Sequence, residues 1–149
     1  MVHALAEIRR VLVPEGILID IRPLSDRWSV EVVSAGGVRQ TGRVDDFAQQ
    51  LNADQASNQA MKEVESRGWF RREQEDSFLF FYSWDTPSEM EEFISDDWSD
   101  FIGLSEEARQ ATRSAWAIGE ADSRVQIAVK ISITKWRVTG EKIRDADQS

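Results

Sequence analysis

The stretch HALAEIRRVLVPEGILIDIRP, residues 3–23, predicts a helix, a tight turn and a strand in close succession. Apolar residues recur at helical spacing from Leu5 to Leu12, and charged residues fill the opposite face. Pro14 ends this helix, and Glu15-Gly16 forms the turn with glycine as its permissive residue. The β-branched run that follows is typical of a strand buried on both faces of a sheet. We expect this strand to consist of Ile17, Leu18, Ile19, Asp20 and Ile21.

The segment EIRRVLVPEGILIDIRP, residues 7–23, resembles the pattern EIxRVLKPGGxLxxxxP of class I S-adenosylmethionine-dependent methyltransferases. In that family it joins the fourth helix of a Rossmann-like domain to the fifth strand, and Glu15 here replaces a glycine of the pattern. The rest of the chain is similar to the C-terminal half of that domain in order and spacing. The resemblance implies an α/β fold with a partial Rossmann-like sheet in the order of the family's strands 5, 7 and 6. The last strand would be antiparallel and central, beside a β-hairpin insertion and flanking helices.

The resemblance also implies that the methyl donor, S-adenosylmethionine, is not bound by this chain alone. The family holds its cofactor with a glycine-rich loop after the first strand and with residues that end the second and third strands. All of these precede the helix with which this chain begins, so Met1 would fall inside the family's domain. Gly36-Gly37 follows a predicted strand, but neither a GxGxG pattern nor a helix start accompanies it. We therefore assign no catalytic and no cofactor-binding residue, and expect the chain alone to be inactive as a methyltransferase.

Composition narrows the chemistry that the chain can perform. Its 149 residues suit one domain, the absence of cysteine excludes thiolate chemistry, and His3 is the single histidine. A net charge of −9 opposes binding to nucleic acid. No apolar run approaches the roughly 18 residues of a membrane span, and no signal peptide is recognisable, so we expect a cytoplasmic protein without membrane contact.

The remaining elements follow from alternation, capping and turn signals. We expect one domain over residues 1–138, with a β-hairpin insertion at 28–44 that turns at Gly36-Gly37, and a disordered tail at 139–149. After the hairpin we expect a long helix capped by Asp45 or Asp46, with a bend or a break near residues 52–54. The elements that we expect after it are an aromatic strand at 77–84, a helix beginning at Pro87, a loop at 95–103, a helix at 105–118 and a half-buried strand at 124–138.

A missing neighbour leaves the strand Ile17–Ile21 with an open edge. In the complete family domain the fourth strand would pair with it. Unpaired β-branched edges are usually covered or paired in natural proteins. We therefore expect a homodimer through this edge, or a second chain that supplies the missing half.

Candidate pocket residues come from the strand end and from the tryptophans. Arg22 directly follows the predicted strand, where open α/β sheets bind ligands, and could hold an acidic acceptor. The aromatic residues that could line an apolar substrate pocket are Trp28, Trp84, Trp98 and Phe101. A structural role is the alternative for each of these residues.

The acidic residues between Asp85 and Asp100 lack the spacing of a calcium loop and predict a solvated helix face, so we expect no metal site. Two alternatives to the methyltransferase-like interpretation are a small-ligand-binding module without catalysis and an interaction module that completes the sheet of another protein.

Overall fold

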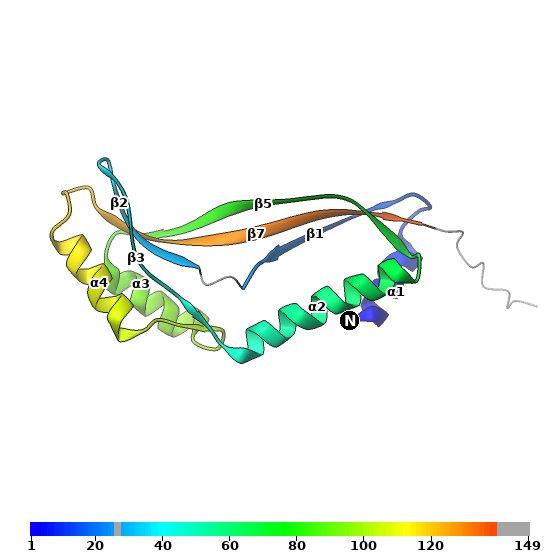
Figure 1. Cartoon of the computed structure of the whole chain (residues 1–149), viewed down its shortest axis with the longest axis horizontal. Coiled ribbons are helices and arrows are strands. Elements are labelled where there is room, and N and C mark those ends of the chain that lie inside the picture. The colour runs from blue at the N-terminus through cyan, green and yellow to red at the C-terminus, as the bar shows by residue number, and fades with distance from the viewer. Residues whose placement is uncertain (26–27, 140–149) are drawn as a thin grey trace, which may run out of the picture. The chain divides into compact units, whose positions relative to one another are not determined.

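The computed structural model describes residues 1–25 and 28–139, without the side chains of residues 48–50. The chain divides into two units, and the strands β5 and β7 contribute residues to both. The first unit contains Met1–Arg22, Asp54–Ser77 and the residues from Ser132, and the second contains Pro23–Ala53 and Phe78–Ile131. Figure 1 shows the elements, which are α1 (Val2–Val11), β1 (Ile17–Pro23), β2 (Ser29–Ser34), β3 (Gly37–Arg43), β4 (Asp45–Asp46), α2 (Ala48–Ser66), β5 (Phe70–Trp84), α3 (Pro87–Phe93), the π-helix η1 (Ile94–Trp98), β6 (Ile102–Gly103), α4 (Glu106–Ala117) and β7 (Arg124–Val138).

The predicted α/β class is confirmed, with an antiparallel sheet and the helices α1 to α4. The long strand β7 pairs with β1, β2 and β5, and β3 pairs with β2. The last strand of the described residues therefore lies between β1 and β5. The short strands β4 and β6 form a separate two-stranded sheet. The finer prediction of a Rossmann-like methyltransferase sheet is not established by this topology.

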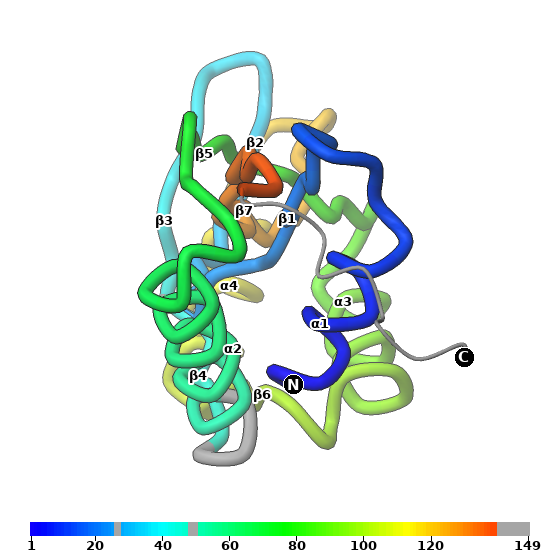
Figure 2. Tube along the Cα trace, turned by 90° about the vertical axis from the view of Figure 1, so that its right-hand side faces the viewer, coloured from blue at the N-terminus to red at the C-terminus, as the bar shows by residue number. Residues whose placement is uncertain are grey.

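In the first unit, α1 and α2 lie on the same side of β1, β5 and β7 (Figures 1 and 2). Leu5 of α1 and Val64 of α2 are buried there against Phe70 and Trp136 of the sheet. Burial of such large side chains contributes about 1.5–3 kcal/mol each. This apolar contact holds both helices on β7.

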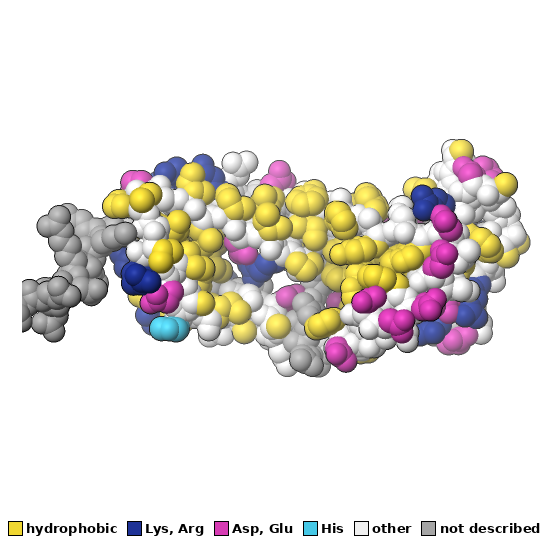
Figure 3. Space-filling view, turned by 180° about the vertical axis from the view of Figure 1, so that it is seen from behind, with side chains coloured by type: hydrophobic (Ala, Val, Ile, Leu, Met, Phe, Trp, Pro, Cys, Tyr) yellow, Lys and Arg dark blue, Asp and Glu magenta, His cyan; other side chains and the backbone are white. Residues whose placement is uncertain are grey.

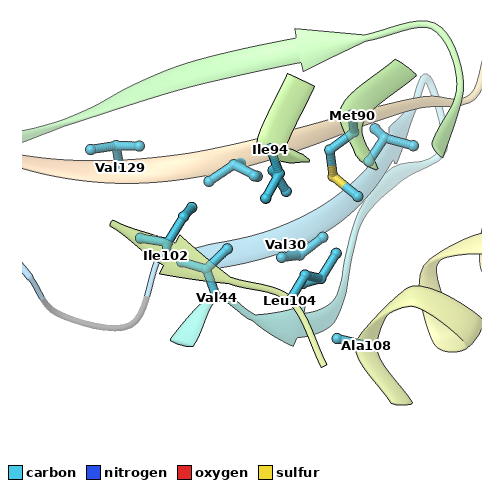
Figure 4. Packing of buried hydrophobic residues seen from close by; sticks show 10 residues of the cluster. Val30, Val44, Met90, Ile94, Ile102, Leu104, Ala108 and Val129 are labelled. Carbon is cyan, nitrogen blue, oxygen red and sulfur yellow. The ribbon is translucent and has the colours of Figure 1, made fainter. Parts of the chain in front are cut away.

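In the second unit, the hairpin of β2 and β3 packs with β7 against the helical segments. Val30 pairs with Ile127 in the antiparallel ladder, and both side chains are fully buried. Figure 4 shows Met90 and Ile94 facing Val30 from the helical side. The prediction of a β-hairpin within residues 28–44 is confirmed. The predicted turn at Gly36-Gly37 was wrong by one residue, because Ser34 pairs with Gly37 and the turn is Ala35-Gly36.

Two helices in the second unit begin at side-chain caps. The Thr86 hydroxyl accepts a hydrogen bond from the Glu89 amide, and the Glu89 carboxylate accepts one from the Thr86 amide. The Ser105 hydroxyl accepts from the Ala108 amide at the start of α4. Such caps stabilise helices by about 1 kcal/mol, which explains why both starts were predictable.

The turn between α1 and β1 forms as predicted, but a different residue adopts the left-handed backbone conformation. Glu15 has a φ of 61°, whereas Gly16 does not have a positive φ. Gly16 is required for space, because a Cβ there would lie 2.7 Å from the Val13 carbonyl oxygen. Position 15 is also the place where the resembled family has glycine.

Several predicted boundaries were wrong. Asp45 and Asp46 form β4 instead of capping a helix, since they pair with Gly103 and Ile102. Helix α2 runs through residues 52–54, so the alternative of a break there was wrong, and the division between the two units falls at the same place. Strand β5 begins at Phe70, and part of the expected loop at 95–103 is the π-helix η1.

Of the predicted tail, residues 140–149 lie outside the described residues. Thr139 is bound to the first unit, because its amide donates to the Trp69 carbonyl and its hydroxyl to the Gly68 carbonyl.

Candidate functional site

The candidate site is the open edge of β1. Among the described strands, β1 pairs with β7 alone. The Val138 amide donates to the Gly16 carbonyl, and the Leu24 amide donates to the Lys130 carbonyl, each at 2.9 Å. The same number of residues separates these two bonds on each strand, so the ladder between them has no net bulge. In an antiparallel ladder, hydrogen-bonding groups alternate sides along the strand. The even-numbered residues therefore bond to β7, and Ile17, Ile19 and Ile21 direct their amide and carbonyl groups to the open edge.

The two faces of β1 are unequally covered. Leu18, Asp20 and Arg22 are half-buried on the face that carries the helices. The exposed fractions of Ile17, Ile19 and Ile21 are 46%, 48% and 58%. The prediction of burial on both faces was wrong, because no described element covers this second face. Exposed hydrophobic side chains are also visible in the space-filling view of Figure 3.

Arg22 is held by side chains of its own unit. One guanidinium nitrogen lies 3.0 Å from an Asp20 carboxylate oxygen, and another donates to the Asn58 side-chain carbonyl at 3.1 Å. The ion pair also neutralises Asp20, the acidic side chain of the strand. Arg22 is therefore engaged by the protein, not left as an isolated cation for an acidic acceptor.

An apolar cavity of about 290 Å³ lies beside β1 in the first unit. Met1, Leu5 and Ile8 line it from the N-terminal segment, and Leu18 lines it from β1. Its polar wall is formed by Asp20 and Arg22. The cavity adjoins the open edge, because Ile19 and Ile21 also line it.

A second, smaller cavity of about 180 Å³ is polar. Arg22, Asn58, Lys62 and Arg72 line it with hydrogen-bond donors, and Glu65 and Glu75 line it with carboxylates. Arg72 donates to the Glu75 carboxylate at 3.0 Å. Trp136 also lines this cavity, is 5% exposed, and its indole Nε1 has no hydrogen-bond partner in the described structure. An unpaired buried donor costs about 1–3 kcal/mol. A water or a ligand oxygen would satisfy it.

The predicted aromatic pocket is a packed cluster in the second unit. The rings of Trp28 and Trp98 meet edge to face at a centroid distance of 5.6 Å. Phe93 connects Trp84 to them, because the centroid of its ring lies 5.3 Å from that of Trp84 and 5.0 Å from that of Trp98. These tryptophans cover the buried apolar core. Their described contacts are packing contacts, and a substrate role for them stays a prediction.

The other predicted pocket residues are placed differently. Phe101 is 46% exposed and takes no part in the ring contacts of the described cluster. Arg22 belongs to the first unit, whereas the four aromatic candidates belong to the second. The predicted pocket set did not include Tyr82 of the aromatic strand, whose ring lies 4.8 Å from that of Trp98. Its position two residues before Trp84 in an alternating strand was the available signal.

The aromatic stretch of β5 is more exposed than expected. Every residue from Phe78 to Tyr82 is exposed, on both faces of the strand. The strand pairs with β7 alone among the described strands. The sequence contained a signal for apolar residues on both faces of this strand, namely the unbroken run of large apolar residues. A strand with one buried face and one solvated face shows alternation instead.

An ion cluster lies on the strands of the first unit. Arg137 and Lys135 both bind the Glu73 carboxylate, and together they lower its pKa to about 2.

Within the described residues, no group of three or more metal-ligating side chains is assembled. Among the described residues, no helix has the length and apolar character needed to cross a membrane.

Comparison with known proteins adds no relative: no family model, no curated protein and no solved structure matches the chain. The site's own geometry therefore carries the functional argument.

Proposed function

We propose that the chain is a methyltransferase-like half domain that does not hold a methyl donor by itself and acts through association at the edge of β1. One observation carries this proposal: the strand that would be internal in a complete domain has an unpaired edge and three exposed isoleucines on one face. Apolar surface and open strand edges of this kind are typical of interfaces.

The arrangement of strands supports the methyltransferase-like part of the proposal. The motif at residues 7–23 forms a helix, a turn and strand β1, as the resemblance implies. β7 lies between β1 and β5, which corresponds to the order of the family's fifth, seventh and sixth strands. The hairpin β2–β3 follows β1, where the family often carries an insertion that shapes the acceptor site.

Calorimetric titration of the purified chain with S-adenosylmethionine tests the catalytic part. We expect no binding at micromolar concentrations, with an active methyltransferase of the same class as the positive control. Micromolar binding by this chain would overturn the statement that it holds no donor by itself.

Light scattering over a dilution series tests the association part. We expect a species larger than one chain at high concentration and dissociation on dilution. The variant Ile19→Asp should be monomeric, because it places a charge in the exposed apolar face of β1. A chain that stays monomeric and free of aggregation at all concentrations would contradict the proposal.

A small-ligand-binding module is the second candidate, favoured by the unpaired indole of Trp136 in a cavity that Lys62 also lines. The indole and the Lys62 ammonium suit a small carboxylate whose oxygen accepts the indole hydrogen bond, and this ligand would share the cavity with Glu65 and with Glu75, which is paired with Arg72. Titration with acetate or succinate, followed by the indole NMR resonances, tests it. A shift of the Trp136 resonance alone supports the site, with Trp136→Phe to assign that resonance. No shift up to millimolar concentrations excludes it.

A further inference from the structure

We infer that the occupant of the β1 edge is a second copy of this chain, paired antiparallel with Ile19 on the two-fold axis. This inference rests on the proposed function, since it names the partner of the same edge. A two-fold interface requires a surface that is complementary to itself. The edge of β1 meets this requirement in its hydrogen-bonding groups, its side chains and its charge.

The hydrogen-bonding groups define which residues can face each other. Ile17, Ile19 and Ile21 present their amide and carbonyl groups to the edge, so each must oppose an odd-numbered residue of the second strand. With Ile19 on the axis, Ile17 opposes Ile21 of the partner subunit, and Ile21 opposes Ile17 of the partner subunit. Every one of these residues then exchanges two hydrogen bonds, about six in the whole ladder.

Neighbouring registers are less favourable. An axis at Asp20 would bring two carboxylates directly opposite each other, and like charges in that position are destabilising. An axis at Ile21 would place Ile19 opposite Pro23, which has no amide to donate. An axis at Leu18 would leave Ile21 opposite Glu15, which lies in the turn and has a φ of 61°. The register centred on Ile19 has none of these defects.

The side chains fit the same register. Ile17, Ile19 and Ile21 of both copies would form one continuous apolar stripe on the face that is exposed in the single chain. Asp20 lies on the other face, is paired with Arg22, and would oppose Leu18 of the partner subunit. The interface therefore joins two chains of net charge −9 through a surface without an unpaired charge. Salt should strengthen the association, because it screens the remaining repulsion.

Single cysteines test the register without background, because the natural sequence contains none. In the proposed dimer, the two Cα atoms at position 19 lie about 5.5 Å apart, within the span of a disulfide. At positions 17 and 21 each Cα lies about 14 Å from its own copy, four residues along the strand. Mild oxidation should therefore cross-link Ile19→Cys in high yield, and Ile17→Cys and Ile21→Cys only weakly. The double variant with cysteines at 17 and 21 should cross-link efficiently again.

Val38→Cys is the control for random collision, because Val38 is 61% exposed and lies on β3 in the second unit. Circular dichroism of each variant before oxidation confirms that it is folded. Cross-linking that is strongest at position 17 or 21, or equal at 17, 19 and 21 and above the Val38→Cys control, would overturn the register while leaving association at β1 intact. A natural chain that is dimeric but yields no cross-link above the Val38→Cys control would overturn this interface. A monomeric natural chain would contradict the proposed function itself.

Discussion

Arg137 binds Glu73 through both carboxylate oxygens, and this contact connects β7 with β5 in the first unit. A second arm of the same guanidinium donates to the Glu15 carbonyl at 2.9 Å, in the turn before β1. Lys135 lies 3.1 Å from the same carboxylate. Arg137 therefore links the turn that positions β1 to the two strands that support it.

The first prediction concerns the pKa of Glu73. Hydrogen bonds from Arg137 and then Lys135 lower this pKa from 4.5 to about 2. Replacing Arg137 with methionine should raise it, although Lys135 will keep it below 4.5. Carboxyl NMR titration of both proteins measures the change. The pKa of Glu7, which Arg10 lowers, should be the same in both proteins and serves as control.

The same contact predicts a dependence of stability on pH. Because the pKa of Glu73 is lower in the folded chain, its contribution is present above about pH 4.5 and is lost as the pH falls toward 2. Urea denaturation across this range should show a smaller loss of stability for Glu73→Gln than for the natural chain. Equal losses would show that the ion cluster does not form in solution.

The second prediction concerns Gly42 in β3. A Cβ at this position would lie 2.7 Å from the Ala108 Cβ and 3.3 Å from the Ala108 Cα of α4. Because the helix backbone cannot move aside easily, Gly42→Ala should destabilise the chain by about 1–3 kcal/mol. Urea denaturation measures this, with exposed Val38→Ala on the same strand as control. An unchanged midpoint would place α4 further from β3.

The third prediction concerns the left-handed residue of the turn. Glu15 adopts a φ of 61°, which glycine tolerates better than any residue with a Cβ. Glu15→Gly should therefore raise the free energy of unfolding by about 1 kcal/mol. Glu15→Ala keeps the Cβ and should give no such gain. Equal effects of the two variants would assign the change to the lost carboxylate instead.

Local signals in the sequence were sufficient for much of the fold. The alternation from Arg124 to Val138 predicted β7 over its observed bounds, and Thr86-Pro87 predicted the start of α3. These elements are specified by side-chain periodicity and by caps, which act over a few residues. The hairpin was predictable for the same reason, although its turn is Ala35-Gly36, one residue before the predicted Gly36-Gly37.

Features that depend on distant neighbours were not predictable. A β-branched run such as Ile17 to Ile21 has the same pattern whether its second face is covered by protein or exposed. The polar residues 71–76, five of them charged, carry no strand signal and become part of β5, which pairs with β7. For the candidate site, the sequence identified the edge of β1. It grouped Arg22 with four aromatic residues that belong to the other unit. It also counted Phe101 with the tryptophans, and Phe101 contacts Trp98 through a backbone hydrogen bond, with no ring contact among the described aromatic pairs.

Amide hydrogen exchange along β1 tests the central claim most directly. At concentrations that favour the dimer, the amides of Ile17, Ile19 and Ile21 should exchange slowly, and dilution should accelerate their exchange. The amides of Leu18, Asp20 and Arg22, which bond to β7, should stay protected at both concentrations. Fast exchange of Ile17, Ile19 and Ile21 at every concentration would contradict pairing at this edge.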